Sequence, residues 1–169
     1  MKIIILFLSS MFFCYALSVG EILSDVVLDK ANGGTSQGNI WHSSSLKGKV
    51  HTLLYVDPDK RDDCKLLLDA LKKLKHKKGD YTTVVIVNLA ATWMPNIILE
   101  SKLKSKEKEL KNMEYIFDKK KYLIEKWQLE DDMSNVFVLD KQGRVIYVKN
   151  GKLIAHDVIE ILNKINEAR

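Results

Sequence analysis

The sequence predicts an α/β fold in which a central mixed β-sheet carries helices on both faces and is preceded by an N-terminal β-hairpin. Two continuous apolar runs of strand length, at 51–57 and 82–88, are typical of parallel strands that are covered on both faces. Helical periodicity follows the first run and returns at the end of the chain. Two further apolar runs joined by a Lys-Gln-Gly turn predict an antiparallel pair.

The first residues, MKIIILFLSSMFFCYALSVG, predict a cleaved secretory signal over residues 1–18. One lysine precedes an apolar stretch too short to span a bilayer comfortably, and the stretch ends on the small residues Ala16 and Ser18. Removing 18 residues from 169 leaves 151, which suits a single domain over 19–169. We therefore expect an exported protein with one cysteine, Cys64, and no internal disulfide.

The first half of the domain contains the predicted hairpin and one strand-helix unit. Residues 26–28 and 38–41 flank the turn-rich segment DKANGGTSQ and predict two short strands joined by a loop. After the strand at 51–57, residues 59–78 place apolar side chains on one helical face and lysines on the other. Aspartates open this helix and Gly79 is expected to end it.

The second half alternates strands and helices before the final hairpin and helix. The strand at 82–88 leads into a loop around Trp93-Met94-Pro95. The remaining predicted elements are a polar helix at 97–111, a short strand at 114–118, a short helix at 121–127, strands at 136–140 and 144–149, and an amphipathic helix at 154–165.

The stretch LKGKVHTLLYVD followed by KRDDCK resembles the L-K-G-K-V, strand and C-x-x-C-K of exported thioredoxin-like reductases. This register puts Arg61 at the position of the attacking cysteine and Cys64 at that of the resolving cysteine. ATWMP at 91–95 also resembles such an active site, but it follows the second strand instead of the first, so we interpret that likeness as accidental. Trp93 and Met94 are expected to cap the end of the second strand or to cover the neighbouring loop.

A more extensive likeness is carried by TVVIVN, FDKKKYLIEKWQL and VFVLDKQGRV in this order. With C-x-x-C missing, the chain resembles the YtfJ family of periplasmic thioredoxin-like proteins. The resemblance implies a thioredoxin-like three-layer sandwich, a location in the periplasm and a function that is not established. It also places Ser134 where thioredoxin-like proteins keep a cis-proline.

Disulfide exchange needs one thiolate to attack and a second thiol to resolve the mixed disulfide, so Arg61 in place of the first cysteine predicts a protein that acts by binding. The expected binding surface surrounds the former active site, because ligands of open α/β sheets lie at the carboxyl ends of the strands. Its residues are Asp57, Asp59, Arg61, Asp62, Asp63, Cys64, Trp93, Ser134 and Asn135.

Two alternatives from enzyme classes stay open. Cys64 could form mixed disulfides with a partner as a single reactive thiol. More remotely, Asp57 and Asp59 end a strand in the D-x-D pattern of Mg²⁺-dependent phosphatases, although Lys60-Arg61 replaces the hydroxyl that usually follows.

No cofactor or metal is predicted, since His42, His51, His76 and His156 have no ligand spacing with each other or with Cys64. The lysine clusters at 72–78, 102–108 and 119–121 give a pI near 9.0 and a basic surface. We interpret them as solvated helix faces. The sharper alternative is attraction to an anionic membrane surface or an acidic partner, and no nucleic acid is expected for an exported protein. The expected partner is a periplasmic protein or a small ligand.

Overall fold

The computed structural model describes residues 17–75, 77, 79–109 and 113–169. Its strands are β1 (Val27–Leu28), β2 (Gly33–Thr35), β3 (Trp41–His42), β4 (Val50–Val56), β5 (Tyr81–Asn88), β6 (Met113–Asp118), β7 (Asn135–Leu139) and β8 (Val145–Asn150). Its α-helices are α1 (Lys65–Lys73), α2 (Asn96–Glu109), α3 (Tyr122–Trp127) and α4 (Ala155–Ala168). Three 3₁₀ helices complete the list: η1 (Ser43–Leu46), η2 (Pro58–Cys64) and η3 (Leu89–Ala91).

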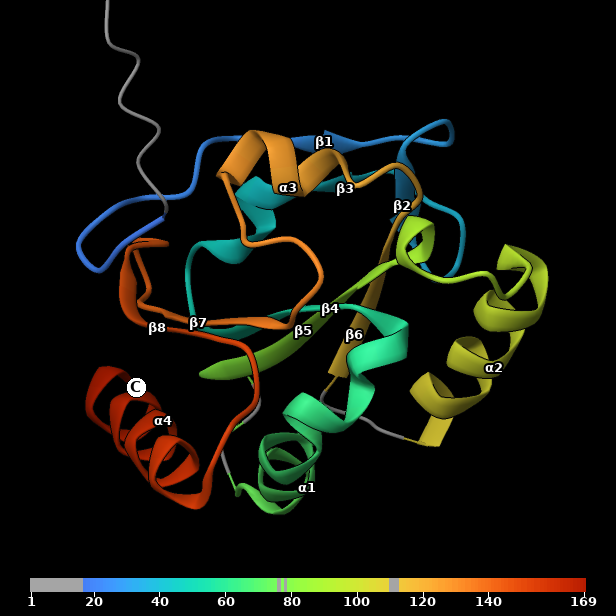
Figure 1. The fold of residues 1–169 in the computed structure, drawn as a ribbon. Coiled ribbons are helices and arrows are strands. Elements are labelled where there is room, and N and C mark those ends of the chain that lie inside the picture. Colours follow the sequence, from blue (N-terminus) through green and yellow to red (C-terminus); the bar gives the residue numbers. More distant parts are fainter. Residues whose placement is uncertain (1–16, 76, 78, 110–112) are drawn as a thin grey trace, which may run out of the picture.

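A six-stranded mixed sheet in the order β2-β6-β5-β4-β7-β8 forms the centre of the molecule (Figure 1). β4 pairs in parallel with β5, and β5 with β6, while β7, β8 and β2 run antiparallel to their neighbours. Every residue of β4 is buried, as expected for a central strand covered on both faces. This confirms the predicted α/β architecture and the order of its main strands.

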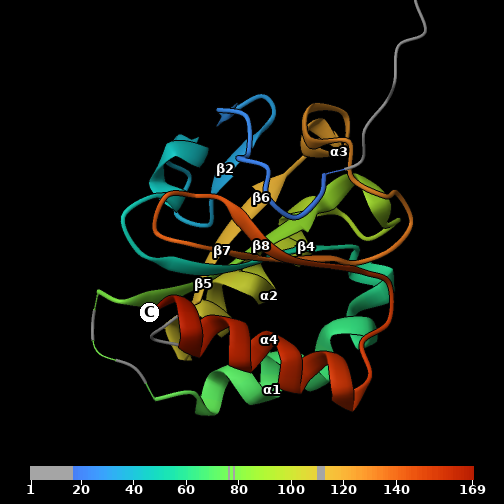
Figure 2. The ribbon, with the colours of Figure 1, turned by 90° about the vertical axis from the view of Figure 1, so that its left-hand side faces the viewer.

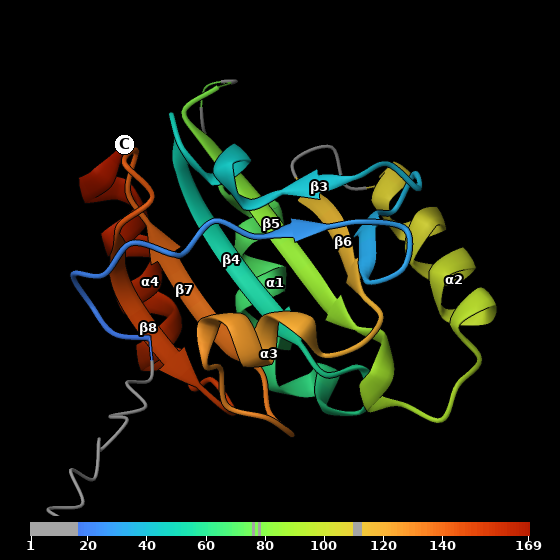
Figure 3. The same ribbon diagram turned by 90° about the horizontal axis from the view of Figure 1, so that it is seen from above.

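The sheet separates two apolar cores, one on each face. Helices α1, α2 and α4 cover one face, while α3 and the N-terminal segment cover the other (Figures 2 and 3). Alternate residues of β4 serve the two cores: Leu54 and Val56 face α1, and Leu53 and Tyr55 face α3. On the α3 side Trp41 and Trp127 make an edge-to-face contact with ring centroids 6.3 Å apart.

The predicted N-terminal hairpin is only part of what this segment forms. β1 and β3 pair as expected, with Val27 opposite His42, but the segment predicted as a loop contains β2, which extends the sheet by pairing with β6. Glycine permits this close approach, because a Cβ on Gly33 would collide with the carbonyl oxygen of Phe117. The same glycines that indicate a turn in the sequence therefore form an edge strand.

The helix predicted over 59–78 is shorter and starts differently. The chain after β4 first forms η2, with Asp57 as its N-cap, and only Lys65–Lys73 is α-helical. The helix ends at Leu74, which has extended backbone angles, so Gly79 does not end it. Proline at the first position of η2 and the Asp57 cap explain why the aspartate-rich stretch adopts a tight 3₁₀ turn.

Nearly all of the predicted signal, residues 1–18, lies outside the described residues, as do His76 and the end of the helix predicted at 97–111. Within the described part of the chain, none of the helices has the length and apolar character needed to cross a bilayer.

Candidate functional site

Each of the three parallel strands ends in a buried Asx residue, and all three lie at one edge of the sheet. Asp57 follows β4, Asn88 ends β5 and Asp118 ends β6. Asp57 accepts a hydrogen bond of 2.8 Å from the backbone N–H of Asp59, and Asn88 accepts one of 3.1 Å from that of Ala90. These side-chain hydrogen bonds turn the backbone away from the sheet. As a result η2, η3 and the start of α3 surround the edge that holds Asp57, Asn88 and Asp118, which we call the polar edge.

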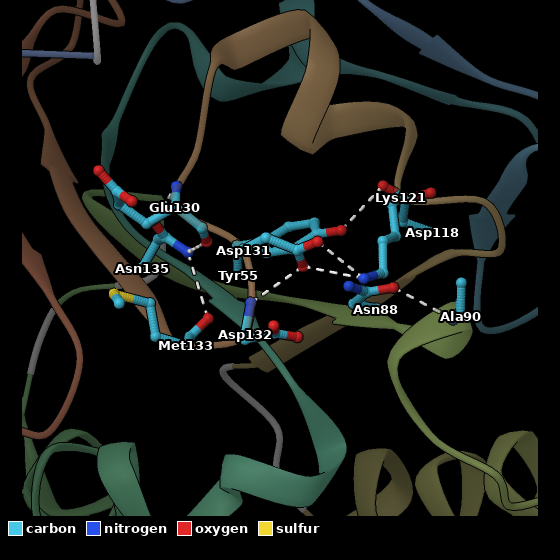
Figure 4. A network of polar contacts seen from close by, with 10 residues as sticks. All are labelled: Tyr55, Asn88, Ala90, Asp118, Lys121, Glu130, Asp131, Asp132, Met133 and Asn135. Atoms are coloured by element: carbon cyan, nitrogen blue, oxygen red, sulfur yellow. Dashed lines mark hydrogen bonds and ion pairs between the residues drawn. The ribbon is translucent and has the colours of Figure 1, made fainter.

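Asp118 is fully buried and organises the α3 side of this edge (Figure 4). Its two carboxylate oxygens accept backbone hydrogen bonds from Lys120, Tyr122 and Leu123 at 3.1, 2.9 and 2.8 Å. Oδ2 also accepts one of 3.1 Å from the Tyr55 hydroxyl. Burial, and then the Asp118 charge, raise the pKa of Tyr55 far above its ordinary value, so Tyr55 stays a neutral donor.

Lys121 and Asp131 connect the loops on either side of α3 (Figure 4). Lys121 takes a left-handed backbone conformation, with φ of 56°, and its Nζ lies 3.0 and 2.8 Å from the two carboxylate oxygens of Asp131. This hydrogen bond lowers the pKa of Asp131 and raises that of Lys121. The charges of Asp131 and Asp57 also act on Tyr55, so both carboxylates belong to the same polar edge.

Asn135 holds the loop between α3 and β7. Its side-chain oxygen accepts from the backbone N–H of Glu130 at 3.0 Å, and its amide donates to the carbonyl oxygens of Glu130 and Met133 at 2.9 and 3.3 Å. The side chain thus has a structural role in this loop, and Figure 4 shows it turned toward Glu130 and Met133.

Cys64 is the last residue of η2, packs in the apolar core beneath α1 and has no exposed surface. Burial raises the pKa of its thiol to about 11, against a smaller lowering by the neighbouring Ser134 hydroxyl. Ser134 Oγ is itself buried and has no well-aligned hydrogen-bond partner among the described residues. No cis peptide bond occurs in the described parts of the chain, so the Met133–Ser134 bond, at the position where thioredoxin-like proteins keep a cis-proline, is trans.

The remaining residues of η2 face solvent. Asp59, Arg61 and Asp62 are exposed, and Asp59 Oδ1 accepts a hydrogen bond of 2.9 Å from Thr92, which links η2 to the loop after β5. Asp63 is partly buried, and its carbonyl oxygen accepts from the backbone N–H of Leu153 at 3.0 Å. Asp63 therefore supports the turn before α4.

A groove of about 890 Å³ opens on the α1 and α2 side of η2, and we call it the Trp93 groove. Its apolar walls come from β5, β6, α1 and α2 and include Val85, Tyr115, Leu68 and Leu99. Four charged side chains line it as well: Asp59, Arg61, Asp62 and Lys102. Trp93 is on its rim with 88 % of its surface exposed, so the prediction that Trp93 caps the end of β5 or covers the neighbouring loop is wrong.

The structure divides the predicted site residues into three groups. Asp59, Arg61, Asp62 and Trp93 meet at the Trp93 groove; Cys64 and Ser134 meet in the interior; and Asp57, Asp63 and Asn135 support turns.

Sequence reasoning missed four members of the polar edge, Tyr55, Asp118, Lys121 and Asp131. The repeated Asx at the end of each parallel strand was the available signal.

The phosphatase alternative would need the carboxylates of Asp57 and Asp59 to point together at a Mg²⁺ ion, and each of them is instead engaged in a local hydrogen bond. Asp57 Oδ1 is engaged with the Asp59 N–H and Asp59 Oδ1 with Thr92. Across the described residues, His, Cys, Asp and Glu side chains form no group of three or more that could hold a metal ion. His51 is buried, and burial is the main cause that lowers its pKa to about 4.

Solved structures of similar shape are thioredoxin-like. A putative thiol:disulfide interchange protein DsbE from Chlorobium tepidum has a TM-score of 0.66 at 15 % identity, covering 90 % of this chain and 99 % of its own. A peroxiredoxin-like protein from Aquifex aeolicus has a TM-score of 0.65 at 17 % identity, covering 92 % and 90 %. At these identities the likeness shows the fold alone, and it confirms the predicted thioredoxin-like fold.

Sequence relatives are more specific. The uncharacterized protein YtfJ of Escherichia coli (strain K12) is 31 % identical over 126 residues, which cover 73 % of this chain and 68 % of that protein. The model of a family of bacterial proteins of unknown function, YtfJ_HI0045, matches residues 23–168. The resemblance inferred from TVVIVN and VFVLDKQGRV is confirmed, and the chain belongs to the YtfJ_HI0045 family.

Proposed function

We propose that this chain is an exported, periplasmic member of its family that does not perform dithiol exchange and acts as a binding module. The observation that carries the proposal is the state of Cys64: the thiol is fully buried, its pKa is raised to about 11, and Arg61 occupies the other position of the former C-x-x-C.

Thiol–disulfide exchange proceeds through a thiolate, and its rate depends on access and on the thiolate fraction. A pKa of about 11 leaves roughly one thiolate in ten thousand at pH 7. The mixed disulfide, once formed, would also need a second thiol, and Cys64 is the single cysteine outside the predicted signal. Both steps of the exchange are therefore disfavoured.

The surface best suited to binding is the polar edge together with the charged residues of η2. Asp59, Arg61 and Asp62 are exposed there, and the Lys121–Asp131 pair lies half-exposed on the α3 side. Both signs of charge occur within this surface, which suits a polar partner that carries both signs as well. The carboxyl ends of the strands in an open α/β sheet are the usual position for such a site.

A disulfide-reduction assay with insulin tests the redox half of the proposal. The mature chain is expected to give no reduction above the dithiothreitol background, and iodoacetamide is expected to label Cys64 only in denaturant. Arg61→Cys is the matched control, since it restores C-x-x-C; this variant should form an internal disulfide and gain reductase activity if only the second thiol is missing. Fast native labelling of Cys64 at neutral pH, with mixed disulfides formed, would instead establish single-thiol chemistry.

Binding and export are tested in cells of the source bacterium. Fractionation is expected to recover the processed chain in the periplasm, and recovery in the cytoplasm would contradict export. A photo-crosslinking amino acid at Lys120, exposed at the start of α3 beside Asp118, is expected to give a discrete adduct, whereas the same group at Glu160, exposed on α4, should not. Equal adducts at both positions would contradict a binding surface at the polar edge. Mg²⁺-dependent phosphatase turnover lost on Asp57→Asn would overturn the binding module in favour of an enzyme.

A further inference from the structure

The Trp93 groove combines an exposed aromatic side chain with an apolar hollow beside it. Trp93 and Ile97 are 88 % and 83 % exposed, and Ile98 follows directly at 48 %. Large apolar side chains exposed next to one another usually mark an interaction surface. The remaining large exposed apolar residues of the described chain are distributed over other elements, so this segment is the densest such patch.

The residue types of the groove indicate a protein partner. Its lining includes Trp93, Met94, Tyr115 and Arg61, which are the types enriched at protein–protein interfaces. Tryptophan and arginine are also the residues that most often carry the binding energy of an interface. A strongly basic lining would favour an anionic partner, but Lys102 is the only lysine among the lining residues that the structure describes.

We infer that a second copy of this chain occupies the Trp93 groove, related to the first by a two-fold axis. A two-fold interface brings the same patch of both copies together, so the patch must complement itself in shape and charge. Here the exposed side chain of Trp93 lies beside a groove of about 890 Å³, so the Trp93 side chain of each copy can enter the groove of the other. The charged lining is balanced, with Asp59 and Asp62 against Arg61 and Lys102, so each carboxylate can face a cation of the other copy.

The local balance matters because the chain carries a formal net charge of +5, and two copies would repel each other through most other surfaces. The described part of the groove lining brings no net formal charge to the contact. Burying Trp93 alone removes about 200 Å² of surface per copy, against about 800 Å² per partner in a standard interface. We therefore expect a dimer that dissociates in the micromolar range. Its contact shares Asp59, Arg61 and Asp62 of η2 with the proposed binding surface, so self-association competes with a partner there, while the Lys121–Asp131 pair on the α3 side stays accessible for the proposed function, beyond which this inference goes.

Sedimentation equilibrium of the mature chain between about 1 and 500 μM is the test. A monomer–dimer equilibrium is expected, together with a blue shift of tryptophan emission as the concentration rises. The shift reports on the groove, because Trp41 and Trp127 are already buried. Trp93→Ala is expected to weaken dimerisation at least tenfold, with folding checked by circular dichroism. Ile159→Ala is the matched control, since Ile159 is 60 % exposed on α4, away from the groove.

Charge reversal tests the two-fold arrangement itself. Asp62→Lys and Lys102→Asp are each expected to weaken self-association, and an equimolar mixture of the two variants should restore it, because opposite charges then meet across the axis. A monomer at all concentrations, a dimer unaffected by Trp93→Ala, or no recovery on mixing would overturn the inference. A chain that stays monomeric while vesicles or detergent micelles shift its emission would do so in favour of an apolar ligand.

Discussion

The hydroxyl of Tyr55 donates a hydrogen bond of 3.1 Å to the carboxylate of Asp118, and this bond ties the central strand β4 to the start of α3. The same carboxylate also accepts hydrogen bonds from three backbone N–H groups, so its oxygens are the acceptors in all four of these bonds.

Asp118→Asn should therefore destabilise the protein by about 2 to 4 kcal/mol, because its amide NH₂ would face a donor in the interior. Tyr55→Phe, which leaves the three backbone bonds intact, should cost about 1 kcal/mol. Urea unfolding measures both. The matched control is Asp25→Asn, an exposed carboxylate 3.6 Å from Lys47, for which less than about 0.5 kcal/mol is expected. Equal costs for Asp25 and Asp118 would contradict the described network.

Gly33→Ala tests the glycine edge strand. A Cβ at this position collides with the carbonyl oxygen of Phe117, so β2 must move away from β6, and a loss of about 2 to 3 kcal/mol is expected. Hydrogen exchange at 116–118 should accelerate at the same time. Gly38→Ala is the control for backbone strain alone: its φ of 87° is left-handed but its Cβ would meet no atom within 4 Å, and about 1 kcal/mol is expected.

Alkaline pH should destabilise the protein through Cys64. Burial raises the pKa of Cys64 from 9.0 to about 11 in the folded state, so above pH 9 the unfolded chain releases a proton that the folded chain keeps. The contribution of Cys64 to the free energy of unfolding is therefore fully present below pH 9 and is lost as the pH rises toward 11. In Cys64→Ala the slope between pH 9 and 10 should flatten, whatever the absolute stability of the variant. An unchanged slope would contradict the raised pKa, because it would mean that Cys64 has the same pKa in the folded and the unfolded chain.

Acid pH should act through Asp157 at the start of α4. The backbone N–H of Ile154 donates to its carboxylate at 2.9 Å and is the main cause of its lowered pKa, with Lys149 contributing from 3.4 Å. This stability is present above the ordinary pKa of about 3.8 and is lost as the pH falls through the lower folded value. Asp157→Asn should destabilise the protein at pH 7 and have a smaller effect near pH 2. Equal effects at both pH values would exclude the carboxylate charge as the cause.

The sequence predicted the main sheet well because its strands carry the pattern of full burial. The apolar runs that became β4 and β5 have no alternation, and that feature alone places them at the centre of a covered sheet. β2 could not be predicted, since GGT has no apolar pattern and forms a strand only because β6 offers a free edge. The early end of α1 at Leu74 was not predicted either, since the lysine-rich sequence beyond it is helix-compatible.

The placement of the former active-site segment was predicted, but the polar side chains around it were not. The register with thioredoxin-like reductases located η2 correctly at the carboxyl end of β4. Tyr55 gave no polar signal inside an apolar run, and Lys121 and Asp131 are ten residues apart in a charged stretch, where sequence cannot tell a specific pair from a solvated surface. Trp93 was expected to pack, and its exposure became visible only once the loop was placed.

The pairing of β2 with β6 has a consequence for the order in which the chain can fold. Gly33 lies opposite Asp118, 85 positions later, and His51 lies opposite Leu139, 88 positions later. Contacts so distant in sequence form slowly, and none of them can form while the later segments are still inside a ribosome. The N-terminal third of the nascent chain thus has no completed sheet to join until the segments that form β6 and β7 have been synthesised.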